Sequence, residues 1–281
     1  MSTLVRPLPS PALRTLTAAD LRRAAPSIYA THPRPGVSAR YAFASTAEVV
    51  DLFHATGWEP VRVQEQRVRL DARRGFQLHE IRFARALDLS TGFLQLGDTH
   101  PELVLQNAHD GSRAYRIDAG LYRLVCHNGL VVADTTFSRV SVRHADVAPA
   151  QFIRAAHAVA HSTPEVMRTV AAWRAIPLSA ARRREFAGHA RTLRWPEANP
   201  VAQHLTADRL LTPRRDRDHE KDLWTTFNVV QEHLLRGGDT YHRTDGERRL
   251  RADRTRPVGS IAAAQGLNKS LWALAHAFAR S

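Results

Sequence analysis

Apolar residues recur with two different spacings along this chain, a strand-like one in the first half and a helix-like one in the second. In the first half, short apolar runs alternate with polar residues and end at turn dipeptides, most clearly Asp110-Gly111 and Asn128-Gly129. These dipeptides supply the positive φ angles of tight hairpins, so we expect both connections to be about two to four residues long. We expect an antiparallel meander with strands at residues 41–43, 60–70, 76–83, 103–109, 114–118, 120–127 and 130–143.

Helix signals precede and follow these strands. Ser45-Thr-Ala-Glu48 is a capping-box pattern that predicts a helix over 46–56, ended by Gly57. Beyond Pro149 helical spacing dominates, and Thr163-Pro164-Glu165 has the N-cap and first-turn proline of a new helix. Helices are expected at residues 18–24, 46–56, 151–162, 163–173, 180–195 and 218–236, and a last one carries Leu267, Leu271, Leu274 and Phe278.

These spacings predict an α+β protein. Its N-terminal part is an antiparallel β-meander with one packed helix, and its C-terminal half is mainly α-helical. We expect a basic, partly disordered leading segment over 1–40 and a β-rich domain over 41–147. A helical region over 148–281 should pack on the sheet as one globular unit.

The composition narrows the protein class. The hydrophobic content of 43% is ordinary for a globular chain, and no run reaches the roughly 18 apolar residues of a membrane span. The first residues lack the apolar core of a secretory signal. Cys126 is the only cysteine, which excludes an internal disulfide and suits a reducing compartment. We expect a cytoplasmic protein without a membrane partner.

The charge balance says more about possible partners than the hydrophobic content does. Forty basic residues against 27 acidic ones give a net charge of +13, a balance typical of nucleic-acid binders. A GC-rich coding bias would explain the preference for Arg over Lys, but it would not explain the excess itself. Two basic clusters are candidate phosphate contacts or solvated loops: Arg22, Arg23, Arg34 and Arg40 in the leading segment, and Arg248, Arg249, Arg251, Arg254 and Arg256 between Gly246 and Pro257.

The two turns also hold residues with catalytic potential. Cys126, His109 and His144 could form a thiol site, or His109, Asp110 and His144 could bind a metal together with His79. Cys126 and its neighbour His127 should point to opposite faces of a strand, so that pair alone cannot act together. No pair shows the short ligand spacing of a zinc site, and we expect neither a metal nor a cofactor. A buried thiol beside plain hairpins explains the same residues.

Aromatic residues on the late helices allow two interpretations. Trp224 with Asn228, and Trp272 with Asn268, fit helix packing with amide hydrogen bonds between helices. They would also fit a stacking platform for single-stranded bases. We favour packing, because Arg is not interleaved with these aromatic residues.

An ordered series of motifs extends through most of the chain. They are Tyr41-Ala-Phe43, Gly57-Trp58, Asn107-Ala-His-Asp-Gly111, Cys126-His-Asn-Gly129, Arg143-His144, Leu223-Trp-Thr-Thr-Phe-Asn-Val-Val-Gln-Glu232 and Leu267-Asn-Lys-Ser-Leu-Trp272. Over residues 24–278 the chain thereby resembles the phage/plasmid-like proteins grouped as "domain of unknown function 932". The resemblance implies a protein of mobile genetic elements. It supplies no catalytic residues, because that family has no established activity.

The working hypothesis is a non-catalytic accessory protein of a plasmid or phage that associates with nucleic acid through Arg–phosphate electrostatics. No helix-turn-helix, zinc-finger or RNP pattern is present, so binding should be single-stranded or non-sequence-specific. One alternative is a hydrolase or metal-dependent nuclease around His109, Asp110, Cys126 and His144. Another is an inhibitor of a host defence or replication protein. The choice of DNA or RNA and the oligomeric state stay open.

Overall fold

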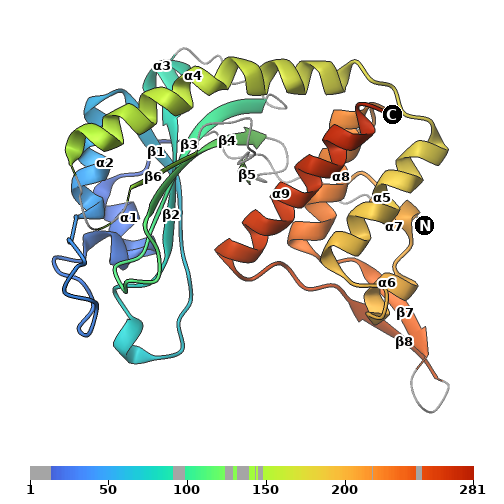
Figure 1. The fold of residues 1–281 in the computed structure, drawn as a ribbon. Helices are drawn as coiled ribbons and strands as arrows, with labels where there is room; N and C mark the ends of the chain where they lie inside the picture. Colours follow the sequence, from blue (N-terminus) through green and yellow to red (C-terminus); the bar gives the residue numbers. More distant parts are fainter. Residues whose placement is uncertain are drawn as a thin grey trace. The chain divides into compact units, whose positions relative to one another are not determined.

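The computed structural model describes residues 14–90, 99–123, 129–131, 139–142, 144, 148–216, 218–244 and 249–281. The chain divides into two compact units. A sheet unit comprises residues 11–122 and 131–166, and a helical unit comprises 1–10, 123–130 and 167–281. Figure 1 traces their elements, and the predicted α+β class is confirmed.

The sheet is antiparallel in every pairing that the described residues define. Its strands are β1 (Trp58–Glu65), β2 (His79–Arg85), β3 (Thr99–Asn107), β4 (Tyr115–Arg123), β5 (Gly129–Val131) and β6 (Arg139–Val142). The order is β1-β2-β3-β4-β5, and β6 also pairs with β4. The β1–β2 register shifts between Pro60 and Arg62, where β1 has an irregularity.

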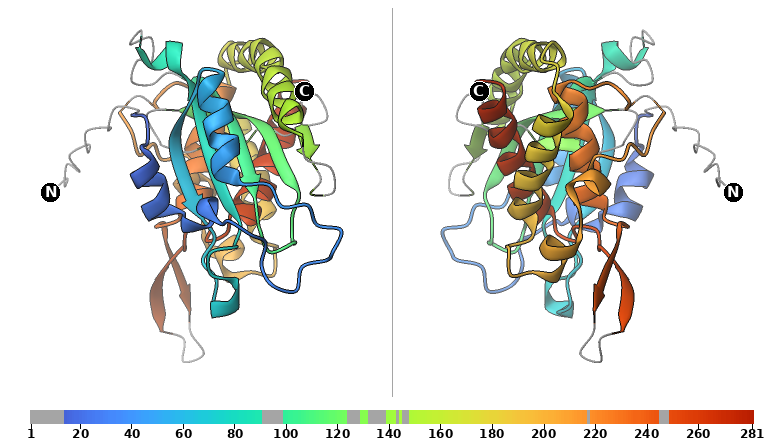
Figure 2. Two further views of the ribbon diagram at one scale, coloured as in Figure 1. Left: turned by 90° about the vertical axis from the view of Figure 1, so that its left-hand side faces the viewer. Right: turned by 90° about the vertical axis from the view of Figure 1, so that its right-hand side faces the viewer.

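One face of this sheet forms the apolar core of the unit. Ile81 and Phe83 of β2 lie directly opposite Leu105 and Leu103 of β3, and all four side chains are buried. This face packs against α1 (Ala18–Ala24), the 3-10 helix η1 (Pro26–Tyr29), α2 (Thr46–Ala55) and the first half of α4 (Pro149–Arg174). Figure 2 shows α2 lying across the strands. Phe53 of α2 meets Phe83 edge-on, with ring centroids 5.2 Å apart.

The other face of β2 and β3 holds a buried ionic network. Arg82 donates to Glu80 at 3.1 Å and to Glu102 at 2.9 Å, and the Gln106 amide donates to the second oxygen of Glu80. Both faces of β2 are therefore buried. Ile81 and Phe83 face the apolar core, and Glu80 and Arg82 on the other face are also buried.

The first two helices form where predicted, and each begins with a side-chain cap. Thr17 and Asp20 make a reciprocal capping box at the start of α1. Ser45 accepts from the Glu48 N–H at the start of α2, and Gly57 follows that helix with a φ of 84°. The 3-10 helix η2 (Asp71–Arg73) and α3 (Ala86–Ser90) complete the unit's short elements. Within the described residues, no helix is long and apolar enough to cross a membrane.

Three details of the predicted meander are wrong. Residues 41–43 are not a strand, although the Ala42 N–H does bond to the His144 carbonyl. The strand predicted at 114–118 and the first residues of the one predicted at 120–127 form a single strand, β4, that runs through Gly120, and residues 108–114 form a longer connection than the predicted hairpin. That connection opens because its backbone bonds elsewhere: His109 N–H donates to Phe76 O, and His109 O accepts from Arg34 N–H. Asn128 lies outside the described residues.

The predicted break before Thr163 is also wrong, because α4 continues from Pro149 to Arg174 with Pro164 inside it. A proline within a helix removes one N–H donor. The hydroxyls of Ser162 and Thr163 do not cap a new helix. Both donate back to the Val159 carbonyl, at 2.8 and 3.2 Å. Ser162 and Thr163 therefore look like helix-start residues in the sequence but lie inside a longer helix.

The helical unit is built around α8 (Leu223–Arg236), whose residues from Leu223 to Leu234 are all buried. A helix buried on every side is the centre of a bundle rather than part of its surface. It begins at Leu223 and not at the expected Asp218, because the Asp222 carboxylate caps it by accepting from Thr225 N–H at 2.8 Å. The unit also contains the last part of α4 together with α5 (Ala180–Arg194), α6 (Pro200–His204), α7 (Ala207–Leu210) and α9 (Ile261–Phe278).

A two-stranded antiparallel ribbon extends away from these helices (Figure 1). It consists of β7 (Thr240–Thr244) and β8 (Leu250–Arg254). The basic segment expected as a loop therefore contributes a strand. Cross-strand pairing and the Arg243–Asp253 ion pair favour the strand despite its charged residues.

Candidate functional site

An arginine-lined pocket of about 500 Å³ lies within the sheet unit. It brings together three segments that are distant in the sequence. Arg34 and Arg40 come from the leading segment, Arg113 comes from the β3–β4 connection, and His144 follows β6. The remaining lining residues are Gly36, Val37, Ser38, Tyr41, Asp110, Gly111 and Ala114. We call this the arginine pocket.

Two loops shape the pocket by packing on each other. The Arg34 N–H donates to the His109 carbonyl at 2.9 Å and ties the leading segment to the β3–β4 connection. Gly111 adopts a φ of 78°, and a Cβ there would lie 3.1 Å from the Val37 side chain. The Asp110 carboxylate accepts from Ser112 N–H at 3.0 Å and stabilises the turn. The Asp-Gly pair therefore makes a turn, as predicted, but in a loop that supports a cavity.

Behind the pocket a chain of buried polar side chains leads into the core. His144 is only 7% exposed, stacks on Tyr41 at 4.2 Å, and lies 2.9 Å from Asn107 Oδ1 through its Nε2. The Asn107 amide nitrogen is 3.1 Å from Thr46 Oγ1, and that hydroxyl lies 3.0 Å from the Nε2 atoms of both His79 and His109.

A set of His tautomers in which each hydrogen bond points toward the core is compatible with these distances. Asn107 Oδ1 can only accept, so His144 carries its proton on Nε2. His79 Nδ1 lies 3.1 Å from the Gln77 carbonyl, so its proton sits on Nδ1 and its Nε2 accepts from Thr46. Thr46 in turn accepts from Asn107 and from His109. In that arrangement the hydrogen bonds run in one direction, from the pocket to the core.

Burial keeps these histidines neutral. It lowers the pKa of His79 to about 4, and burial together with the nearby His79 and His144 lowers the pKa of His109 to about 3. The pKa of His144 is also lowered by burial, although the carbonyls of Ala42 and Arg113 act in the opposite direction. At neutral pH the arginines and Asp110 therefore define the charge of the pocket.

The catalytic candidates are only partly brought together. Asp110 and His144 line the pocket, whereas His109 is completely buried behind it. Cys126 lies outside the described residues. In the part of the chain that the structure describes, no group of three or more His, Cys, Asp or Glu side chains is arranged to hold a metal ion.

The arginines predicted to contact phosphate lie in three separate parts of the structure. Arg22 lies over the Tyr29 ring at 4.0 Å, and Arg23 pairs with Asp20 at 2.5 Å, so both are engaged on or near α1. Arg34 and Arg40 reach the pocket. Arg251 and Arg254 lie on β8, with Arg249 just before it and Arg256 just after Thr255, and all four are exposed; Arg248 lies outside the described residues.

The late aromatic residues belong to the core of the helical unit. Trp224 and Trp272 are 2% and 1% exposed and surround Trp173, so they offer no surface on which bases could stack. Gln231 donates to Asn268 at 2.7 Å across the α8–α9 contact, and Asn228 donates to the Trp224 carbonyl within α8.

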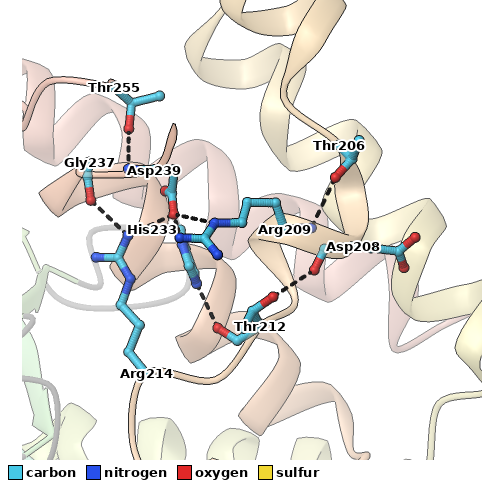
Figure 3. Close-up of polar contacts among 9 residues, drawn as sticks. All are labelled: Thr206, Asp208, Arg209, Thr212, Arg214, His233, Gly237, Asp239 and Thr255. Carbon is cyan, nitrogen blue, oxygen red and sulfur yellow. Dashed lines mark hydrogen bonds and ion pairs between the residues drawn. The ribbon is translucent and has the colours of Figure 1, made fainter. Parts of the chain in front are cut away.

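Asp239, at the base of the ribbon, is a feature that the sequence did not reveal (Figure 3). It is fully buried and accepts from Arg214 at 2.9 Å, lies 3.4 Å from Arg209, and meets His233 Nδ1 at 2.7 Å. His233 Nε2 points to the Thr212 carbonyl at 2.8 Å. Both ring nitrogens therefore lie within hydrogen-bond distance of an oxygen acceptor.

The electrostatic balance at Asp239 favours its charged form. Burial raises its pKa, but the hydrogen bond and charge of His233 and the charge of Arg214 outweigh burial and lower it. The Asp239 N–H donates to Thr255 Oγ1 at 3.0 Å, so the same residue also binds the far strand of the ribbon. We call this set the Asp239 network, and its geometry anchors the ribbon to α8.

Comparisons with known proteins place the chain in a family. The model of the family described as "Domain of unknown function (DUF932)" matches residues 35–272. Two proteins of Escherichia coli K12 are similar over nearly their whole length. "UPF0380 protein YafZ" is 32% identical over 94% of this chain and 92% of its own, and "UPF0380 protein YfjQ" is 32% identical over 93% and 91%. No solved structure matches. The resemblance drawn from the motifs is thus confirmed, and the chain belongs to the DUF932 family.

Proposed function

We propose that this protein associates with nucleic acid through arginine–phosphate contacts, without sequence-specific readout and without catalysis, as an accessory protein of a plasmid or phage. The observation that carries the proposal is the β7–β8 ribbon. It combines exposed arginines on an element that extends from the helical unit with a buried network that holds its base.

The charge pattern of the ribbon supports an anionic partner. Arg243 and Arg251 lie directly opposite each other on the two strands, and Arg243 also pairs with Asp253. Arg254 lies on the opposite face, beside Thr240. A phosphate backbone would supply further acceptors to these exposed arginines, because each phosphate can accept hydrogen bonds from a guanidinium. The net charge of +13 would draw such a polyanion to the molecule.

A salt titration tests the proposal. Labelled single- and double-stranded oligonucleotides are titrated with protein at two salt concentrations. Counterion release predicts a log–log slope of about −0.7 per phosphate contact on single strands and about −0.9 on duplexes. The double variant Arg251→Ser/Arg254→Ser should make the slope shallower by roughly one to two contacts.

The matched control is Arg67→Ser/Arg69→Ser, which removes the same charge from an exposed stretch after β1. It should leave most of the slope in place, because it lowers only the overall charge. Binding weaker than about millimolar at low salt, or a slope that both variants change equally, would contradict the proposal.

A further inference from the structure

We propose that the arginine pocket of the sheet unit binds a nucleotide phosphomonoester, the phosphorylated end of a nucleic-acid strand. This inference rests on the proposed function and assigns the pocket a role different from that of the ribbon. The ribbon would contact phosphates along the strand, and the pocket would recognise where the strand ends.

The charge of the pocket matches a phosphomonoester better than an internal phosphodiester. Arg34, Arg40 and Arg113 face a single carboxylate, Asp110, so the formal charge of the lining is +2. His144 adds none, because burial lowers its pKa. A phosphodiester carries one negative charge, whereas a terminal phosphate carries about −1.5 to −2 at neutral pH.

Arg34 supplies an independent indication of a missing ligand. Its Nε atom is buried and has no hydrogen-bond acceptor among the described protein atoms. A buried guanidinium donor without an acceptor is costly, and most such donors in folded proteins have a partner. A phosphate oxygen in the pocket would provide that acceptor, and guanidinium geometry allows two parallel bonds to it.

The remaining lining fits the rest of a nucleotide. A volume of about 500 Å³ exceeds the needs of a phosphate alone and lies in the range of small-ligand sites. Asp110 Oδ1 already accepts from Ser112, and its carboxylate can accept a sugar hydroxyl but repels a second phosphate. That repulsion disfavours a strand continuing through the pocket and favours its terminus.

The test compares oligonucleotides that share one sequence and differ only in whether an end carries a phosphate. An internally labelled single strand is prepared with a 5′-phosphate, with a 3′-phosphate, or with hydroxyls at both ends, and its binding is followed by fluorescence anisotropy. One phosphorylated form should bind about tenfold more tightly than the hydroxyl form, the effect of one charge-assisted contact. Arg113→Ser and Arg40→Ser should each abolish the preference, and each should weaken binding of the hydroxyl form no more than Arg69→Ser does.

Arg69→Ser is the matched control and should retain the preference. Thermal unfolding of each variant checks that the sheet unit is folded. Equal affinity for all three strands, or a preference that persists in Arg113→Ser, would overturn the inference while salt-dependent binding upheld the proposed function. A nucleoside monophosphate that binds wild type but not Arg113→Ser, when no strand binds, would uphold the pocket and contradict the proposed function.

Discussion

At the scale of single residues, the buried histidines make stability depend on pH. His79 and His109 ionise near 6.5 when unfolded but have folded pKa values of about 4 and about 3. The unfolded chain therefore binds more protons as the pH falls below 6.5, and the folded state loses stability. Between pH 7.5 and 5 we expect a loss of about 2 kcal/mol for each, measured by urea unfolding.

Two variants separate this effect from general acid sensitivity. His109→Gln removes one buried titrating group, so its stability should fall less steeply over this range than that of wild type. His204→Gln removes an exposed histidine from α6 and should retain the wild-type slope. Identical slopes in all three proteins would show that the buried histidines do not control acid unfolding.

Two adjacent glycines at the base of the ribbon, Gly237 and Gly238, differ in the space available for a side chain. A Cβ on Gly237 would lie 2.6 Å from the backbone of Arg256, whereas nothing lies within 4 Å of one on Gly238. Both have positive φ, 61° and 83°. Gly237→Ala should therefore cost about 2–4 kcal/mol, from the clash and the backbone strain together. Gly238→Ala should cost about 1 kcal/mol, from strain alone.

Denaturant unfolding of the two variants measures this difference directly. The expected order is wild type, then Gly238→Ala, then Gly237→Ala. If both alanines cost the same, the close approach of Arg256 to Gly237 would be wrong.

At the scale of elements, Pro164 lies inside α4, where an alanine would make the helix more stable. Pro164 lacks the N–H that would bond the Ala160 carbonyl. Pro164→Ala should restore that bond and raise the free energy of unfolding by about 1–3 kcal/mol. Pro149→Ala is the control: Pro149 is the first residue of the helix, where a missing donor costs nothing, so stability should stay nearly unchanged. A loss of stability in Pro164→Ala would show that the helix does break there.

Helix ends were more predictable than strand connections because caps are local. Ser45 and Ser179 accept from N–H groups three residues ahead, so the pattern is complete within four positions. The β3–β4 connection depends instead on Arg34 and Phe76, whose distance from His109 in the sequence hides the contact. The ribbon was missed for a related reason: its arginines and aspartate have low strand propensity, and cross-strand partners override it.

At the scale of the whole molecule, the sequence identifies several residues of the candidate sites but does not show which of them lie close together. It singled out Arg34, Arg40, Asp110 and His144, yet gave no sign that all four line one pocket with Arg113. Asp239 and His233 had no recognisable motif, because their partners come from separate turns and helices. Proximity of this kind follows from folding, so composition can suggest an anion-binding protein without locating its sites.

The ribbon's arginines also affect whether two copies of the protein can associate through their ribbons. A ribbon of two strands has two edges, and Leu250 leaves 73% of its surface exposed beside them. Exposed edges invite strand addition from a second molecule, and like charges oppose it. A bound polyanion would neutralise those charges and remove the opposition. Molecules gathered on one long strand could then join edge to edge, so occupancy would spread cooperatively from the first bound copy.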